Sequence, residues 1–184
     1  NIELDKNVTL PDGAVLTEIS FDEYVSRLAK ARSISLQEAY EIESRDISLM
    51  SRGEYKYYDY SRVFEYKYNK NFEGEVNATI KVYISSDTSF RQIEDVFGIS
   101  SKRKSGLYVY TWTETSAWSD PREGSSQFPT LSVTIGVDGY FEVTITGSVG
   151  GSVDLPGFSV SGEYSWGNTY ISRNVPVRVT YRVH

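Results

Sequence analysis

Residues that could perform catalysis are scarce in this chain. The single histidine is the last residue, His184, and there is no cysteine. Serine-histidine-aspartate sites, cysteine-histidine sites and histidine-rich zinc sites are therefore excluded by composition. The glycines around Gly147–Gly151 also lack the lysine and the following helix that a phosphate-binding loop needs.

Carboxylates are the remaining groups that could act as acids or bases. A glycosidase needs two of them at about 5 to 10 Å with separated pKa values. Glu114, Glu142 and Glu163 lie on predicted strands among aromatic residues, but the alternation of each strand places them on solvent faces. We therefore assign no catalytic residue, and a glycoside hydrolase stays an alternative that depends on these three.

Oxygen ligands for calcium occur in predicted loops, at Asp120, Glu123 and Asp154. Their spacing does not match a regular calcium-binding loop. The sequence thus assigns no metal and no cofactor.

Aromatic residues are abundant, with 15 Tyr, 8 Phe and 3 Trp. Trp118 falls in a predicted loop, Ser116–Pro121, while Tyr83 and Tyr140 share strand faces with polar residues. Exposed rings of this kind can stack on sugars or anchor a protein partner. Trp118, Tyr83 and Tyr140 are therefore the candidate binding residues; the alternative for Trp118 is that it folds back over one end of the fold.

Length and charge limit the remaining choices. The 184 residues predict a single domain, 1–184, with an N-terminal helical segment at 1–52 and a β-rich body at 53–184. A net charge of −6 argues against nucleic acid as a partner. No apolar run is long enough for a transmembrane helix. The lack of cysteine and the Ser, Thr, Tyr and Gly content of the strands favour an extracellular or cell-envelope location.

Two amphipathic helices are predicted first. Capping boxes begin at Ser20 and Ser35, each with a glutamate three residues later, and a tight turn is expected near Ser33. The expected apolar stripes are Phe21, Tyr24, Val25, Leu28 and Ala29, then Leu36, Ala39, Tyr40 and Ile47.

The same segment resembles a helix-turn-helix DNA-binding unit at Leu28–Lys30, Ile34–Ser35, Ala39 and Ile42–Glu43. The resemblance implies DNA contact by the second helix. That helix carries Glu38, Glu41 and Glu43, which phosphate would repel, so a helical hairpin packed on a sheet is favoured.

From Glu54 onward the hydrophobic period is two, which predicts about seven or eight antiparallel strands. The fold class is therefore mainly β, an antiparallel β-sandwich or open barrel with the helical hairpin packed on it. Alternation assigns these rings to the core: Tyr58, Phe64, Tyr66, Phe141, Phe158, Tyr164 and Tyr181.

Local signals add further expectations. A change of alternation predicts a bulge at Tyr57–Tyr58, and a short helix is expected at 90–97 between a Ser89 cap and Gly98. Apolar residues at both parities predict a strand at 107–112 buried on both faces.

Two turns and an edge are also predicted. A hairpin with a three-residue loop at Val137–Gly139 would bring the apolar sets of its two arms to one face. Pro176 belongs at a sheet edge or a strand start, because it has no N–H to donate.

Residues Thr144–Trp166 are Ser/Thr-rich and alternate, and they are similar to the amphipathic hairpins of β-pore-forming toxins. That resemblance implies insertion into a membrane, so a pore-forming or membrane-interacting protein stays an alternative. The favoured function is a non-enzymatic, exported binding domain for a glycan, a cell-envelope component or a protein.

Overall fold

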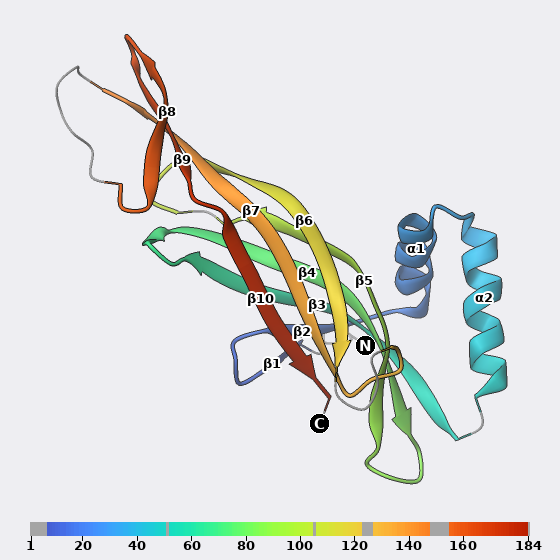
Figure 1. Ribbon diagram of the computed structural model, residues 1–184. Helices are drawn as coiled ribbons and strands as arrows, with labels where there is room; N and C mark the ends of the chain where they lie inside the picture. Colours follow the sequence, from blue (N-terminus) through green and yellow to red (C-terminus); the bar gives the residue numbers. More distant parts are fainter. Residues whose placement is uncertain (1–6, 51, 105, 123–126, 148–154, 184) are drawn as a thin grey trace, which may run out of the picture.

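Two antiparallel sheets pack face to face as a sandwich, with two helices to one side (Figure 1). The structure is a computed structural model that describes residues 7–50, 52–104, 106–122, 127–147 and 155–183. The first sheet has the order β1-β2-β3-β4-β5; the second has the order β10-β7-β9-β8, with β6 paired to β7. The predicted sandwich is confirmed, with ten strands among the described residues.

The elements of the first half are β1 (Asn7–Thr9), β2 (Val15–Ile19), α1 (Phe21–Arg32), α2 (Leu36–Leu49), β3 (Gly53–Tyr66), β4 (Asn69–Ser85) and β5 (Arg91–Arg103). Those of the second half are β6 (Tyr110–Arg122), β7 (Ser132–Thr146), β8 (Phe158–Tyr164), β9 (Gly167–Ser172) and β10 (Val175–Arg182).

The main core lies between the two sheets and is rich in rings. Its fully buried members include Tyr60, Tyr66, Phe72, Ile80, Ile93, Tyr110, Ile135 and Phe141. Phe141 contacts the rings of several of its neighbours from the other sheet, at centroid distances near 6 Å or below. Edge-to-face and tilted ring pairs of this kind stabilise a core beyond their buried area.

The helical hairpin forms where the capping boxes predict it. Ser20 and Ser35 each accept a hydrogen bond from the N–H three residues later, at 3.1 Å. The box at Ser35 is complete, because Glu38 accepts from the Ser35 N–H at 2.9 Å, whereas at Ser20 only this first bond is formed and Glu23 binds Arg27 instead. Ser33 adopts a left-handed conformation (φ 53°) at the end of α1, which makes the tight turn. The expected stripe of α1 is confirmed: Tyr24, Val25, Leu28 and Ala29 are buried.

The expected stripe of α2 is wrong apart from Ala39. Leu36, Tyr40 and Ile47 are exposed, and α2 instead buries Ala39 and Glu43. The face was misassigned because the residue that α2 places deepest against the sheet is charged. A buried carboxylate does not register as part of an apolar stripe, although it can be held there by a cation.

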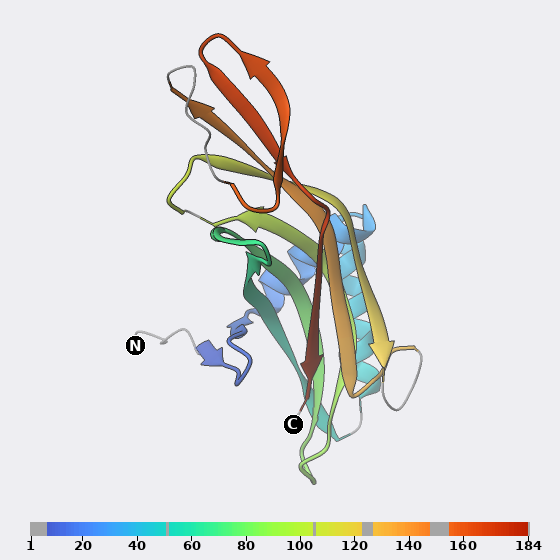
Figure 2. The same cartoon turned by 60° about the vertical axis from the view of Figure 1, so that its left-hand side comes forward.

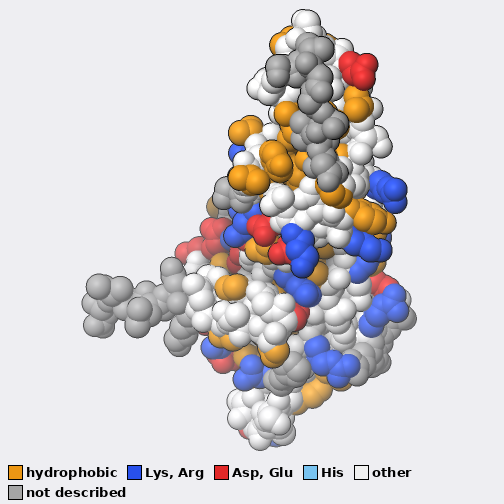
Figure 3. Space-filling model, turned by 90° about the vertical axis from the view of Figure 1, so that its left-hand side faces the viewer, with side chains coloured by type: hydrophobic (Ala, Val, Ile, Leu, Met, Phe, Trp, Pro, Cys, Tyr) orange, Lys and Arg blue, Asp and Glu red, His pale blue; other side chains and the backbone are white. Residues whose placement is uncertain are grey.

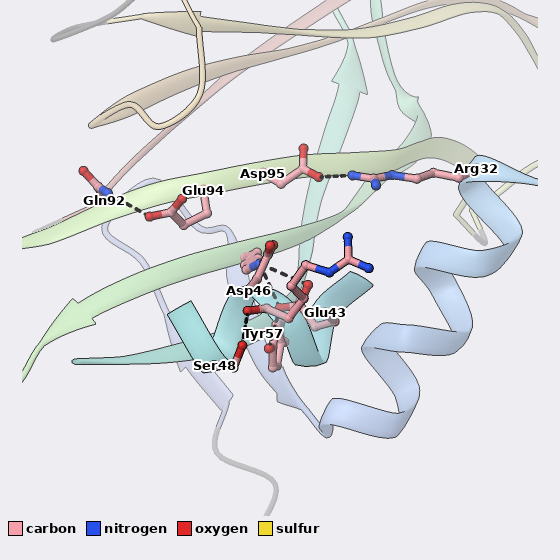
Figure 4. Close-up of polar contacts among 10 residues, drawn as sticks. Arg32, Glu43, Asp46, Ser48, Tyr57, Gln92, Glu94 and Asp95 are labelled. Carbon is pink, nitrogen blue, oxygen red and sulfur yellow. Dashed lines mark hydrogen bonds and ion pairs between the residues drawn. The ribbon is translucent and has the colours of Figure 1, made fainter. Parts of the chain in front are cut away.

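Glu43 is held by a polar cluster beneath α2. Lys81 of β4 contacts both Glu43 carboxylate oxygens, at 2.8 and 3.0 Å, and Tyr57 of β3 donates to one of them at 2.7 Å (Figure 4). Asp46 lies 3.1 Å from the Lys81 ammonium, and the Tyr55 ring lies 4.1 Å from it. We call these residues the polar anchor: Glu43, Asp46, Tyr55, Tyr57 and Lys81.

The bulge expected at Tyr57–Tyr58 is wrong. The pairing of β3 with β4 runs without a shift from Gly53 to Glu65. Tyr57 is buried and Tyr58 is partly buried, because helices cover one face of β3 and the second sheet covers the other. Alternation fails as a signal when both faces are covered.

The short helix predicted at 90–97 is wrong, because residues 91–97 belong to β5. Ile93 and Val96 both face the core although they are three residues apart, since a register shift after Ile93 leaves Glu94 unpaired with β4. A bulge thus reproduces the spacing of a helix. Gly98, read as a helix stop, has φ +63° at a second shift of the same pair of strands.

The predicted turn at Val137–Gly139 is also wrong, because β7 runs straight through it from Ser132 to Thr146. The two apolar sets have the same parity, so a single strand already places them on one face; Val133, Ile135, Val137, Phe141 and Val143 are all buried. β6 shifts register between Glu114 and Ser116, opposite this point.

The strand expected at 107–112 is not buried on both faces. β6 begins at Tyr110, and Leu107 and Val109 are among the most exposed hydrophobic residues described, at 76% and 86%. The prediction for Pro176 is confirmed, since β10 is an edge strand that pairs with β7 alone.

One end of the second sheet extends beyond the sandwich. β8 and β9 form a hairpin that pairs with residues 142–146 of β7, beyond the stretch of β7 that pairs with β10 (Figure 2). We call the end of this hairpin, Tyr164–Gly167, the tip.

Candidate functional site

The tip carries an exposed pair of aromatic rings. Tyr164 and Trp166 stack with centroids 4.8 Å apart and planes 8° apart, and each side chain is 52% exposed. This corrects the prediction that Tyr164 faces the core. β8 ends at Tyr164 and Trp166 sits in the turn, so the alternation that buries Phe158 does not continue to the tip.

Two more exposed apolar side chains precede β6. Leu107 and Val109 lie in the irregular segment before Tyr110, where β6 begins opposite Val143. The space-filling view of the side facing left in Figure 1 shows hydrophobic side chains gathered on the upper half of the molecule (Figure 3). An apolar group of this kind at one end of a molecule marks a contact surface.

Cations lie at the other end of the same hairpin, where β8 begins and β9 ends. The Arg173 guanidinium lies 5.0 Å from the centre of the exposed Tyr68 ring, and the Lys67 ammonium lies 5.4 Å from it. Tyr68 also lies at that end of the hairpin, since a Cβ added at Gly157 would meet its side chain, and Gly157 is separated from the tip by the length of β8, about 20 Å. Aromatic rings beside cations can contact both sugar faces and anionic groups.

Trp118 lies on a strand rather than in the expected loop. It sits in β6 directly opposite Gly136, and a Cβ at Gly136 would come within 2.3 Å of its ring. The Arg178 guanidinium lies 4.8 Å from the ring centre and is bound in turn to Asp138 at 3.2 Å. The ring therefore reaches across β7 to β10 and covers the outer face of the second sheet.

The other two candidate aromatics do not join Trp118 in one site. Tyr140 is half-buried in β7, opposite Thr113, on the same outer face as Trp118. Tyr83 lies in the first sheet, where its hydroxyl donates to the Arg52 carbonyl at 2.7 Å and its ring contacts Tyr55. The binding role of these three residues stays a prediction.

The three candidate carboxylates lie apart along the second sheet. Glu114 pairs with Gly139 of β7, Glu142 belongs to β7 itself, and Glu163 reaches the level of Ile145 through β9. Successive levels are three residues apart, about 10 Å along a strand. Glu114 accepts a hydrogen bond from Ser101 at 2.7 Å. No described cavity unites the three.

The calcium candidates are separated too. Asp120 lies on β6 and contacts Arg122 at 2.6 Å, whereas Glu123 and Asp154 are outside the described residues. Within the part of the chain that the structure describes, no group of three or more metal-ligating side chains comes together.

The polar anchor is the strongest electrostatic feature, yet its groups are occupied by one another. Burial would lower the Lys81 pKa, but hydrogen bonds and charge from Glu43 and Asp46 outweigh it and raise that pKa. Burial, together with the hydrogen bond to Glu43, raises the pKa of Tyr57 above its ordinary value. Lys81 is 5% exposed and Glu43 1%. The cluster therefore fastens α2 to the sheet and offers no free acid or base to a substrate.

A hollow of about 650 Å³ lies beside α1, and its lining includes Arg27, Asp59 and Thr79. Arg27 already contacts Glu23 at 2.9 Å and Asp59 at 2.8 Å, and donates to Thr79 at 3.3 Å. Its charge is used to hold α1 on the first sheet.

Comparisons with models of known protein families, with curated proteins and with solved structures give no match to this chain. Neither helix of the described residues is long and apolar enough to cross a membrane. The candidate site is therefore the tip with its apolar neighbours, reached from geometry alone.

Proposed function

We propose that this protein is a non-enzymatic binding domain of the extracellular space or cell envelope, and that it contacts its ligand through the tip. The observation that carries the proposal is the exposed stacked pair, Tyr164 and Trp166. Two stacked rings with half of each surface in water hold each other in place and present apolar ring surface at low conformational entropy. An exposed ring of this kind suits the apolar face of a sugar in an envelope glycan.

Tryptophan fluorescence tests the proposal because the three tryptophans occupy different environments. Trp112 packs against Phe64 and Phe141, Trp118 packs against Gly136, and Trp166 is exposed. Titration with a panel of soluble cell-wall polysaccharides should shift or quench the emission of the wild type and of Trp118→Phe. The Trp166→Ala variant should lose the response.

Unchanged emission across the whole panel would reject the glycan ligand. A response retained by Trp166→Ala and lost by Trp118→Phe would move the site to the outer face of the second sheet.

A lipid surface is the second candidate ligand, favoured by the large exposure of the aliphatic side chains of Leu107 and Val109. Exposed aliphatic and aromatic side chains beside cations are typical of proteins that lie on anionic membranes. Co-sedimentation with phosphatidylglycerol vesicles, but not with phosphatidylcholine vesicles, would support it. Release of an entrapped dye would distinguish a pore former from a protein that only adsorbs.

A further inference from the structure

The outer face of the second sheet carries two aromatic rings within the sandwich. Trp118 of β6 pairs with Gly136 of β7, and Tyr140 lies four residues further along β7. Tyr140 points away from the core because its neighbour Phe141 is buried between the sheets, and residues an even number apart on a strand share a face. The helices pack on the first sheet, so no described helix or strand covers this face.

The tip continues the same face. Tyr164 pairs with Gly167, which pairs in turn with Thr146 of β7. Thr146 lies six residues beyond Tyr140, so Tyr164 is on the outer face as well. Its ring lies over Gly162, where an added Cβ would come within 2.9 Å of it. The stacked pair of the tip therefore lies on the face that carries the rings of β6 and β7.

These rings follow the length of β7, and we call them the aromatic line: Trp118, Tyr140, Tyr164 and Trp166. At about 3.3 Å a residue, the level of Trp118 is about 13 Å from Tyr140, and Tyr140 is about 20 Å from the level of the tip. One continuous strand joins the two ends (Figure 1). A single sugar or a disaccharide cannot span the whole line of about 33 Å, whereas an extended polymer can.

Trp118 turns one face of its ring to solvent. Gly136 lies beneath the ring, and the Arg178 guanidinium lies 4.8 Å from the ring centre. That guanidinium donates to the main-chain carbonyls of Val137 and Val177, at 3.2 and 2.9 Å, so it lies against the sheet. The sheet and the guanidinium thus support the ring from below and leave its other face for a ligand.

The side chains around the aromatic line are rich in hydroxyls. Register places these hydroxyl side chains on the same face: Thr111, Thr113, Ser116, Thr144, Thr146, Ser159 and Thr169. Arg178 is bound by Asp138 at 3.2 Å, so the charge left over along the line is that of Glu142. Hydroxyls can donate to and accept from the hydroxyls of a sugar, whereas a surplus carboxylate repels an anionic polymer. A protein partner would need a larger apolar centre than these separated rings supply.

We propose that the ligand is a neutral, extended polysaccharide that lies along the aromatic line from the tip to Trp118. The inference rests on the sugar-binding role proposed for the tip and adds the length and the charge of the ligand. Rings at three levels stack on sugars of one chain, and the hydroxyls between them bond to its hydroxyl groups. Affinity should therefore rise with chain length until the polymer spans the line.

Affinity electrophoresis in native gels tests the charge and the length of the ligand. The gels contain hydroxyethylcellulose, glycol chitin or dextran, or the carboxymethyl derivative of the same polymer. At least one neutral polymer should retard the protein, and its carboxymethyl derivative should bind at least about threefold more weakly. At equal sugar concentration, the matching disaccharide (cellobiose, chitobiose or isomaltose) should bind at least about tenfold more weakly than the polymer when tryptophan emission is followed.

Variants locate the polymer on the sheet. Trp118→Thr and Tyr140→Thr remove one ring each and insert a residue type that suits an exposed strand. Each should weaken the polymer about twofold to tenfold and leave the disaccharide within about twofold. Phe90→Thr removes an exposed ring of the first sheet and should change neither affinity. Trp166→Ala removes the contact at the tip and should weaken both ligands; the Tyr140 variant keeps the test intact if loss of Trp118 unfolds the protein.

Several results would overturn the proposal. One is the failure of all three neutral polymers to retard the protein; if the disaccharides also fail, the sugar-binding role of the tip is lost with it. Equal binding of a disaccharide and its polymer would reject the extended site and leave the tip as a site for a short sugar. Undiminished binding of the carboxymethyl derivative would reject a neutral ligand. Wild-type affinity in both threonine variants would remove the sandwich from the site, and self-association abolished by Trp118→Thr would make a second copy of this chain the occupant.

Discussion

The polar anchor and the tip place similar side chains in opposite surroundings. Beneath α2, two tyrosines, two carboxylates and a lysine meet in a largely buried cluster in which each charge has a partner. At the tip, Tyr164 and Trp166 stack on each other and each is 52% exposed. The difference separates side chains that hold the fold together from side chains that are free to contact a ligand. Substitutions should therefore change stability in the first region and binding in the second.

The largest expected effect comes from Glu43→Ala, which leaves Lys81 buried with only Asp46 as an ionic partner. Breaking a buried pair from one side lowers the free energy of unfolding by about 3 kcal/mol. Chemical denaturation measures the change, and Glu41→Ala on the exposed side of α2 is the control, with less than about 0.5 kcal/mol expected. A double variant, Glu43→Leu with Lys81→Met, should lose less than Glu43→Ala; an equal or larger loss would mean that packing rather than charge holds α2.

Alkaline pH should weaken the same region. Burial raises the pKa of both Tyr24 and Tyr57, and both are close to Glu43. Unfolded tyrosine ionises near pH 10, so the folded state retains protons that the unfolded chain releases above that pH. Stability is fully present below pH 10 and should fall by about 2 kcal/mol from these two groups between pH 10 and 11. Denaturation midpoints across this range measure the slope, which Tyr24→Phe should reduce by about half.

Two identical chemical changes should act in opposite directions. Tyr57→Phe removes the hydrogen bond to Glu43 and should lower stability by about 1 to 2 kcal/mol. Tyr60 is fully buried between the sheets, and its hydroxyl makes no hydrogen bond of ordinary geometry to a described group, although burial raises its pKa and the Arg62 side chain is close enough to offset part of that rise. Tyr60→Phe should therefore raise stability by up to about 1 kcal/mol. Thermal unfolding of both variants tests the contrast; a loss in both would show that the Tyr60 hydroxyl is satisfied.

The smallest change in stability is expected at the tip. Tyr164→Ala and Trp166→Ala remove rings that cover no core, so the free energy of unfolding should change by less than about 0.5 kcal/mol for each. The same variants should abolish the binding proposed for the tip. A loss above about 1.5 kcal/mol in either would make the stacked pair part of the fold rather than a contact surface.

The sequence predicted those parts of the structure that follow from local signals. The caps at Ser20 and Ser35, the turn at Ser33 and the alternation of β10 depend on neighbouring residues, and all three are confirmed. The sandwich followed from period-two alternation over the last two thirds of the chain.

The errors arose where a distant partner decides the outcome. Ile93 and Val96 have the spacing of a helix because a bulge against β4 turns both side chains to the core. Asp138–Gly139 has the sequence of a turn but lies inside a strand that is paired on both sides. Glu43 becomes a core residue only because Lys81 faces it from another element. The candidate site was missed for a related reason: the strand pattern continues through Tyr164, while the body of the sandwich does not extend that far.

The continuity of β7 has a mechanical consequence. Its residues 132–139 are paired on both sides within the sandwich, and its residues 142–146 carry β9 and, through it, the tip. Because one unbroken strand joins the two parts, the tip is not an arm on a hinge. A pull on a ligand at the tip runs along β7 into the ladders with β6 and β10, so the load is shared by many backbone hydrogen bonds acting together. A load applied at the tip is therefore expected to enter the sandwich through the ladder of β9 with residues 142–146 of β7 rather than through a flexible linker.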